Sequence, residues 1–60
     1  MANLTSKELS ALEDQLGYEK ILISKYHTFA NLASDPQIKS KYQSVAQRHQ
    51  EHYNKLLKHL

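Results

Sequence analysis

Three ionisable residues, Glu19, His49 and His52, occupy positions where an amphipathic helix would carry apolar side chains. Glu19 lies seven residues after Leu12 and seven before Tyr26, on an apolar stripe of the first half of the chain. His49 and His52 are separated by three residues, so they share one face of a helix. Imidazole and carboxylate groups that converge inside a helical bundle can bind iron, zinc or manganese.

A turn near residues 34–36 would bring these three groups to the same height, that is, to the same position along the axes of two antiparallel helices. In an antiparallel pair of helices with that turn, the numbers of facing residues sum to roughly 71, so Glu19 faces His52 and His49 lies near Ile23. A twofold dimer would bring two copies of this layer together, with two carboxylates and four imidazoles.

Two interpretations of the layer stay open. In the first, Glu19 accepts hydrogen bonds from His49 or His52, Tyr26 or Tyr53 completes the network, and the network fixes the helix register. In the second, Glu19, His49 and His52 bind a divalent metal, zinc or iron. The His-x-x-His spacing alone is common, but its coincidence with a core carboxylate at the same height is less so.

The elements that position this layer are two long helices, in one domain that covers residues 1–60. The segment Thr5–Glu8 matches a capping box, which marks a helix start. Pro36 disfavours helical geometry at Asp35, which can then cap a second helix that Pro36 opens. We expect helices over about 5–34 and 36–59, joined by a turn at 34–36, and no strands.

The apolar arc of each predicted helix is wider than one antiparallel partner can cover. The first helix carries two neighbouring apolar stripes, Leu9, Leu12, Leu16, Ile23, Tyr26, Ala30 and Ala33 beside Ala11, Tyr18, Leu22, Phe29 and Leu32. The second carries Ile38, Tyr42, Val45, Leu56 and Leu60, flanked by Ala46, Tyr53 and Leu57. The predicted fold is therefore an all-α antiparallel hairpin, half of a four-helix bundle, completed by a homodimer or higher homo-oligomer.

Composition supports an assembly and excludes several functions. A single core of 60 residues supplies only about 3–5 kcal/mol, and the absence of cysteine excludes disulfides and thiolate metal sites. The net charge of +2 divides as −1 over residues 5–34 and +3 over 35–60, without the dense basic stripe of a nucleic-acid-binding protein. No signal peptide or membrane span is visible, so we expect no membrane association and a place inside the cell, in the cytoplasm.

Nothing in the sequence resembles a nucleophile with its base, a phosphate loop or a nucleotide motif, so we do not expect an enzyme and assign no catalytic residue. His27 and His59 fall outside the layer and are expected at the surface. Gly17 costs about 1 kcal/mol in a helix interior and is compatible with a close approach or a slight bend.

Taken together, Glu19, the turn segment 33–39 and the pattern Ala46-x-x-His49-x-x-His52 resemble half of a ferritin-like bundle. Within that superfamily the chain is most similar to the small spore coat proteins of the Coat F type. The segments that carry this similarity are Leu4-Thr5-x-x-Glu8-Leu9 and His49-Gln50-x-His52-Tyr53-x-x-Leu56-Leu57.

The resemblance implies a ferritin-like hairpin that is deposited in the spore coat, with other coat proteins as partners and no established reaction. Di-iron members use Glu-x-x-His on the second helix, and His49 stands where that pattern has its Glu. A dimer would then hold two carboxylates instead of four, which argues against di-iron oxidase chemistry. The sequence favours a structural protein, followed by a metal-binding dimer and a helical partner domain for another protein.

Overall fold

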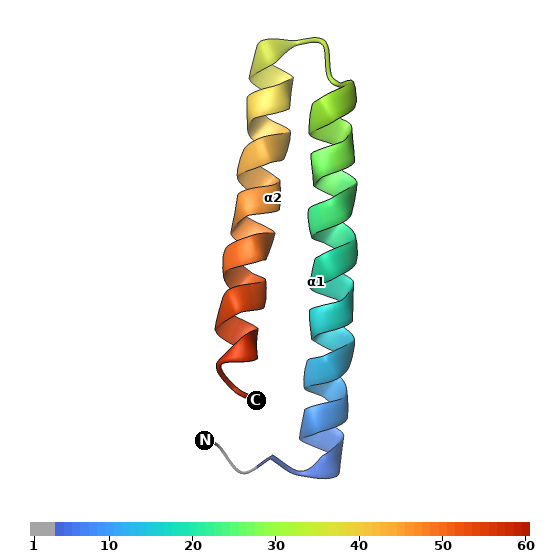
Figure 1. Ribbon diagram of the computed structural model, residues 1–60, viewed down its shortest axis with the longest axis vertical. Helices are drawn as coiled ribbons and strands as arrows, with labels where there is room; N and C mark the ends of the chain where they lie inside the picture. The colour runs from blue at the N-terminus through green and yellow to red at the C-terminus, as the bar shows by residue number, and fades with distance from the viewer. Residues whose placement is uncertain (1–3) are drawn as a thin grey trace.

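A computed structural model describes residues 4–60 as two helices packed side by side. Helix α1 covers Ser6–Leu32 and α2 covers Pro36–Leu57. Figure 1 shows them antiparallel, with the turn at one end of the molecule and the first turns of α1 extending past the end of α2 at the other. The described residues contain no strand. The prediction of an all-helical hairpin is confirmed.

Helix α1 is capped at both ends by local hydrogen bonds. The backbone N–H of Thr5 donates to the Glu8 carboxylate at 3.0 Å, and the N–H of Glu8 donates to the Thr5 hydroxyl at 3.1 Å. This is the capping box that the sequence predicts. The helix ends at Leu32 and not at residue 34, because Ala33 is already extended with a ψ of 129°.

Asp35 is the N-cap of α2, and its side chain accepts hydrogen bonds from the N–H groups of Gln37 at 2.8 Å and Ile38 at 3.3 Å. Pro36 follows as the first helical residue, where its missing N–H costs nothing. At the other end the N–H groups of the last three residues, 58–60, donate to carbonyls three residues earlier. This tighter winding explains why α2 ends at Leu57 and not near residue 59.

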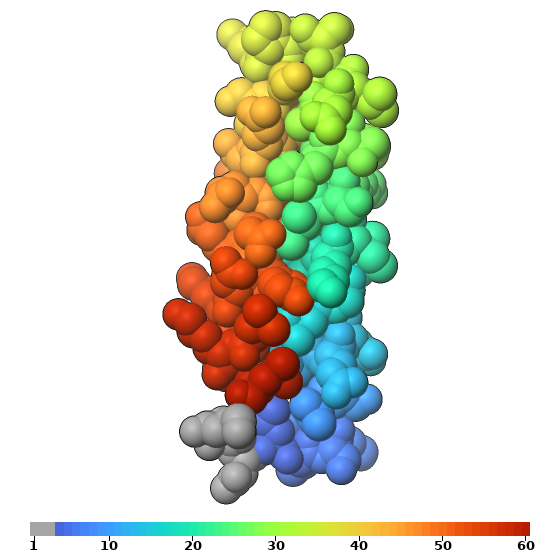
Figure 2. Space-filling view, in the orientation of Figure 1, coloured from blue at the N-terminus to red at the C-terminus, as the bar shows by residue number. Residues whose placement is uncertain are grey.

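The contact between the two helices is narrow. Among residues 4–60 only three apolar residues are buried, and two of them, Ala30 and Ala46, are small enough to let the helices approach closely. Figure 2 shows the side chains of α1 and α2 meeting along the length of the molecule. The large apolar side chains that remain exposed in the described part of the chain are Leu9, Tyr18, Ile21, Phe29, Leu32, Ile38, Leu57 and Leu60. No helix within residues 4–60 is long and apolar enough to cross a membrane.

The molecule is long and thin for its size. Its Cα radius of gyration is 14.3 Å, whereas a compact domain of this length has a radius of about 10 Å. The accessible surface is 4780 Å², compared with about 4,000 Å² for a compact monomer of this mass. The hairpin therefore exposes several hundred Å² more than a globular protein of its size.

Candidate functional site: a buried carboxylate between two histidines

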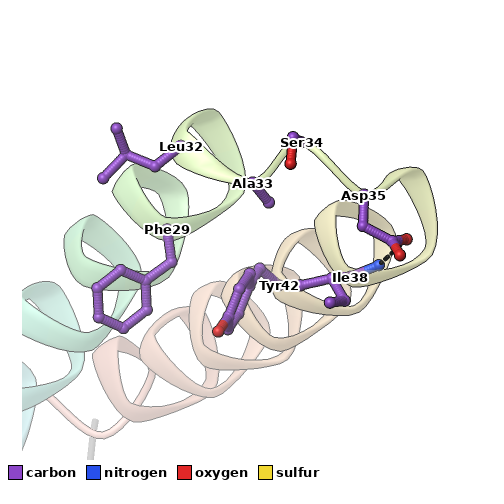
Figure 3. A pocket seen from close by; sticks show the side chains of 7 residues that line it. All are labelled: Phe29, Leu32, Ala33, Ser34, Asp35, Ile38 and Tyr42. Carbon is purple, nitrogen blue, oxygen red and sulfur yellow. Dashed lines mark hydrogen bonds between the residues drawn. The ribbon is translucent and has the colours of Figure 1, made fainter.

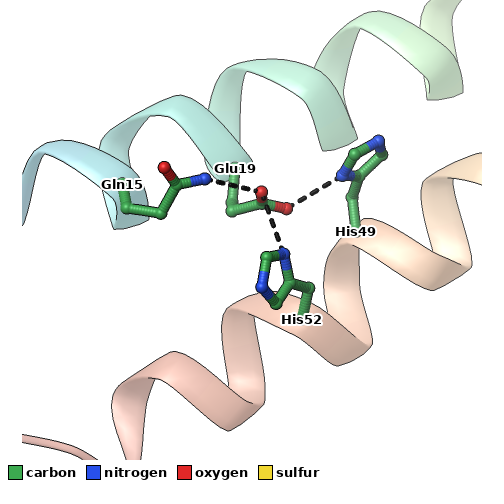
Figure 4. Close-up of polar contacts among 4 residues, drawn as sticks. All are labelled: Gln15, Glu19, His49 and His52. Atoms are coloured by element: carbon green, nitrogen blue, oxygen red, sulfur yellow. Dashed lines mark hydrogen bonds and ion pairs between the residues drawn. The ribbon is translucent and has the colours of Figure 1, made fainter. Parts of the chain in front are cut away.

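Glu19 lies at the middle of α1 and points toward α2, with 2% of its surface exposed. Its Oε2 accepts a hydrogen bond from Nδ1 of His49 at 2.9 Å, and its Oε1 accepts one from Nδ1 of His52 at 3.1 Å. The side-chain amide of Gln15, one turn earlier on α1, donates to Oε1 at 3.0 Å. Figure 4 shows the carboxylate between the amide and the two rings, so its buried oxygens are satisfied.

These contacts determine the charge state of the carboxylate. Burial raises the pKa of Glu19, but the hydrogen bonds from His49 and Gln15, together with the charge of His49 and His52, outweigh burial and lower the pKa below its ordinary value. Glu19 is therefore ionised at neutral pH. An ionised carboxylate only accepts hydrogen bonds, so each Nδ1 must carry its proton.

The two histidine rings have different surroundings. The side chain of His49 is 28% exposed and stacks on Tyr26, with ring centroids 6.0 Å apart and the planes 9° apart. Tyr26 also contacts the rings of Phe29 and Tyr42, so His49 adjoins an aromatic cluster. The side chain of His52 is 53% exposed and lies at the surface of the hairpin.

The structure brings together the three residues that the sequence placed at one height, including the predicted pair Glu19 and His52. It differs in what completes the network. Gln15 is the third donor, and sequence reasoning missed it although a Gln four residues before a Glu can bond to it on a helix. Tyr26 stacks on His49 instead of donating to the layer.

Tyr53, the other tyrosine considered for the network, lies below the ammonium group of Lys20, with Nζ 5.9 Å from its ring centroid. His27 and His59 are exposed, and neither contacts the layer of Glu19 in the described part of the chain.

The arrangement is a hydrogen-bonded network within one chain. Among residues 4–60 there is no group of three or more His, Cys, Asp or Glu side chains placed to hold a metal ion. Metal binding by Glu19, His49 and His52 stays a prediction.

A second feature is an open hollow of about 390 Å³ beside the turn. Figure 3 shows the rings of Phe29 and Tyr42 beside each other along its lining, with Ile38 nearer the turn. The Asp35 carboxylate at its edge already caps α2. The hollow therefore offers apolar surface and few polar groups that could orient a small ligand.

The comparisons with known proteins bear on the whole hairpin. The chain is 30% identical over 57 residues to the uncharacterized protein YuzM of Bacillus subtilis (strain 168), a match that covers 95% of the chain and 70% of YuzM. The chain belongs to the YuzM family. Because YuzM is itself uncharacterized, this membership assigns neither a reaction nor a ligand. No family model and no solved structure matches the chain.

Proposed function

We propose that this chain is a non-enzymatic, self-assembling structural protein whose working unit is a dimer of hairpins that forms a ferritin-like four-helix bundle. The observation that carries the proposal is an apolar surface on one side of the hairpin, which we call the open face. Its members are Tyr18, Leu22, Phe29 and Leu32 of α1 and Ile38, Tyr42, Val45, His52 and Leu56 of α2.

The open face follows from two stripes of residues with helical spacing. On α1 its members recur at intervals of three, four or seven residues, beside the stripe of Glu19 that packs on α2. The rings of Phe29 and Tyr42 lie 5.4 Å apart, which places the two stripes on one side of the hairpin. The opposite side is polar and carries the exposed residues Glu13, Lys20, His27, Asn31, Gln47 and Asn54. The hairpin is amphipathic as a unit.

The surface area favours a second copy as the partner on the open face. The surplus over a compact monomer is of the order of 700 Å², close to the roughly 800 Å² that each partner buries in a standard interface. Tyr18 is 56% exposed and Leu32 is 77% exposed, so large apolar side chains are available for burial.

Charge favours one orientation of the two copies. The residues of α1 sum to −1 (three Lys against three Glu and one Asp), and those of α2 sum to +3 (three Lys and one Arg against one Glu). A twofold axis parallel to the helices places α1 of each copy against α2 of the other, so unlike charges adjoin. The same axis places each layer of one hairpin, including the layer of Glu19, beside the equivalent layer of the other hairpin.

Sedimentation equilibrium and thermal melts over a hundredfold range of concentration test the dimer. We expect a dimeric mass and a Tm that rises with concentration. Leu32→Glu should weaken association at least about 100-fold, because a twofold interface carries the change twice. Asn31→Glu is the matched control, since Asn31 is exposed on the polar side of α1. A monomer with a concentration-independent Tm would contradict the proposal.

The spore coat is the proposed location, with other coat proteins as further partners, on the strength of the resemblance to the Coat F type. A fluorescent fusion expressed in a spore-forming host should accumulate at the periphery of the spore. A diffuse signal in the sporulating cell would contradict the location but not the dimer.

A non-enzymatic role is supported by the chemistry of the layer, where one carboxylate per chain is half of what a di-iron site uses. We expect no ferroxidase activity from the protein supplied with Fe²⁺. Iron oxidation that is lost in Glu19→Ala would make the chain an enzyme instead.

A further inference from the structure

The outer nitrogens of the two histidines are the part of the site that the network does not use. Both rings bond to Glu19 through Nδ1, and in Figure 4 the second nitrogen of each ring, Nε2, lies on a side away from the carboxylate. Neither Nε2 hydrogen-bonds to another residue of the described range 4–60. Because Nδ1 carries the proton in the neutral ring, Nε2 carries a free lone pair.

This arrangement is the one that proteins use to prepare histidine as a metal ligand. A carboxylate that accepts a hydrogen bond from one ring N–H fixes the tautomer and the ring orientation. It also makes the other ring nitrogen a stronger electron-pair donor to a metal. Glu19 does this for two rings at once, and it is itself held by Gln15. Tyr26 further restrains the plane of His49.

We propose that the dimer binds a divalent transition-metal ion of the zinc class through Nε2 of His49 and His52 from both copies, with Glu19 as an outer hydrogen-bond acceptor and not as a ligand. The inference rests on the dimer proposed above. It differs from a site in which Glu19 itself binds the metal, because both oxygens of Glu19 already accept hydrogen bonds from the imidazoles.

One chain cannot complete such a site. Zinc takes three or four protein ligands, and each hairpin offers two outer imidazole nitrogens, consistent with the absence of a larger ligand group within residues 4–60 of one chain. His52 is 53% exposed and belongs to the open face, so it faces the proposed partner. The proposed twofold arrangement would bring the two pairs together, and four imidazole nitrogens suit Zn²⁺, Cu²⁺ or Ni²⁺ better than Mg²⁺ or Ca²⁺.

The test uses untagged full-length protein that has been stripped with EDTA and then titrated with ZnCl₂ by calorimetry, with the mass measured in parallel. We expect one Zn²⁺ per two chains and a Tm raised by several degrees. His52→Ala should weaken binding at least about 100-fold, because it removes one of the two ligands of each chain. Since His52 belongs to the open face, sedimentation equilibrium in EDTA measures separately what the change does to the metal-free dimer. His27→Ala, outside the layer, should bind as wild type does.

The role of Glu19 is tested separately. Glu19→Gln should weaken Zn²⁺ binding by about 10–100-fold but keep the ratio of one ion per two chains. Nitrogen-15 NMR of the histidine rings should show Zn²⁺ on Nε2 and the proton on Nδ1 in the wild type. Zn²⁺ on Nδ1, or X-ray absorption that shows a carboxylate oxygen bound to the metal, would overturn the assignment of Glu19 as an outer acceptor.

The outcomes separate the two proposals. A dimer that binds no Zn²⁺ overturns the metal site and leaves the dimer standing. A monomer that binds no Zn²⁺ overturns both, and a monomer that binds one Zn²⁺ per chain overturns the shared site.

Discussion

Tyr26 lies parallel to His49 across the interface between the helices, with the planes 9° apart. The contact joins α1 to α2 one layer nearer the turn than Glu19. In the described residues the hydroxyl of Tyr26 takes no part in the network around Glu19. Separate substitutions can therefore measure what the ring and the hydroxyl each contribute to stability.

We expect Tyr26→Phe to change the free energy of unfolding by less than about 0.5 kcal/mol, because the ring stays and no hydrogen bond is lost. Tyr26→Ala should cost about 2–3 kcal/mol, since it removes a half-buried ring from an aromatic cluster. Urea denaturation at one fixed protein concentration measures both. A large loss in Tyr26→Phe would show that the hydroxyl has a partner, as the first interpretation from sequence proposed.

Removing the histidines should cost more than removing the whole layer. In the double variant His49→Leu, His52→Leu, Glu19 stays buried with Gln15 as its remaining donor, and we expect a loss of about 3 kcal/mol. Adding Glu19→Leu should restore stability to the wild-type level or above, because no buried charge remains. The measurement is urea denaturation in EDTA. Equal losses in the double and triple variants would mean that the buried carboxylate is not the cause.

Stability should fall in acid partly because of Glu19. Its pKa is lowered in the folded protein, so the stability that it contributes is complete above the unfolded-state pKa of a glutamate and is lost as the pH falls through the lower folded value. Glu8, whose pKa the Thr5 backbone N–H lowers, acts in the same direction. The test compares wild type with Glu8→Gln and Glu19→Gln in EDTA at acidic pH. An unchanged acid slope in Glu19→Gln would contradict the contribution of Glu19.

Gly17→Ala should stabilise the hairpin by about 1 kcal/mol, the difference in helix propensity between the two residues. A Cβ at this position would meet nothing within 4 Å, so the close approach that the sequence suggested is absent within the hairpin. Thermal melts at matched concentration measure the gain. A lower Tm would instead indicate that another chain packs against Gly17.

Much of the hairpin could be predicted because local sequence determines where each of its two helices starts. Thr5 and Glu8 form the start of α1, and Asp35 with Pro36 forms the start of α2, through bonds that span two or three residues. The turn then set the register well enough to predict that Glu19 faces His52. The C-terminal ends of the helices were less predictable. Ala33 and Lys58 have ordinary helix-forming side chains, and their backbone geometry depends on how the chain turns.

The details of the site were less accessible to sequence. Spacing placed His49 on the correct face, but it did not determine whether Tyr26 stacks on that ring or donates to the layer, because both fit the same helical position. The apolar stripes of α1 predicted more surface than α2 covers, and the exposure of Leu32 and Tyr18 agrees with that. The proposed dimer would cover them.

The short turn also restricts how the length of this sequence can change. Glu19 and His52 are joined through the turn, so inserting one residue between Glu19 and the end of α1 would rotate Glu19 by about 100° away from α2. Relatives that keep the network should therefore be free to gain or lose residues before Thr5 or after Leu57, while the distance along the chain from Glu19 to His52 stays constant. That constancy is a criterion by which longer homologues can be sorted into those that retain the network and those that have lost it.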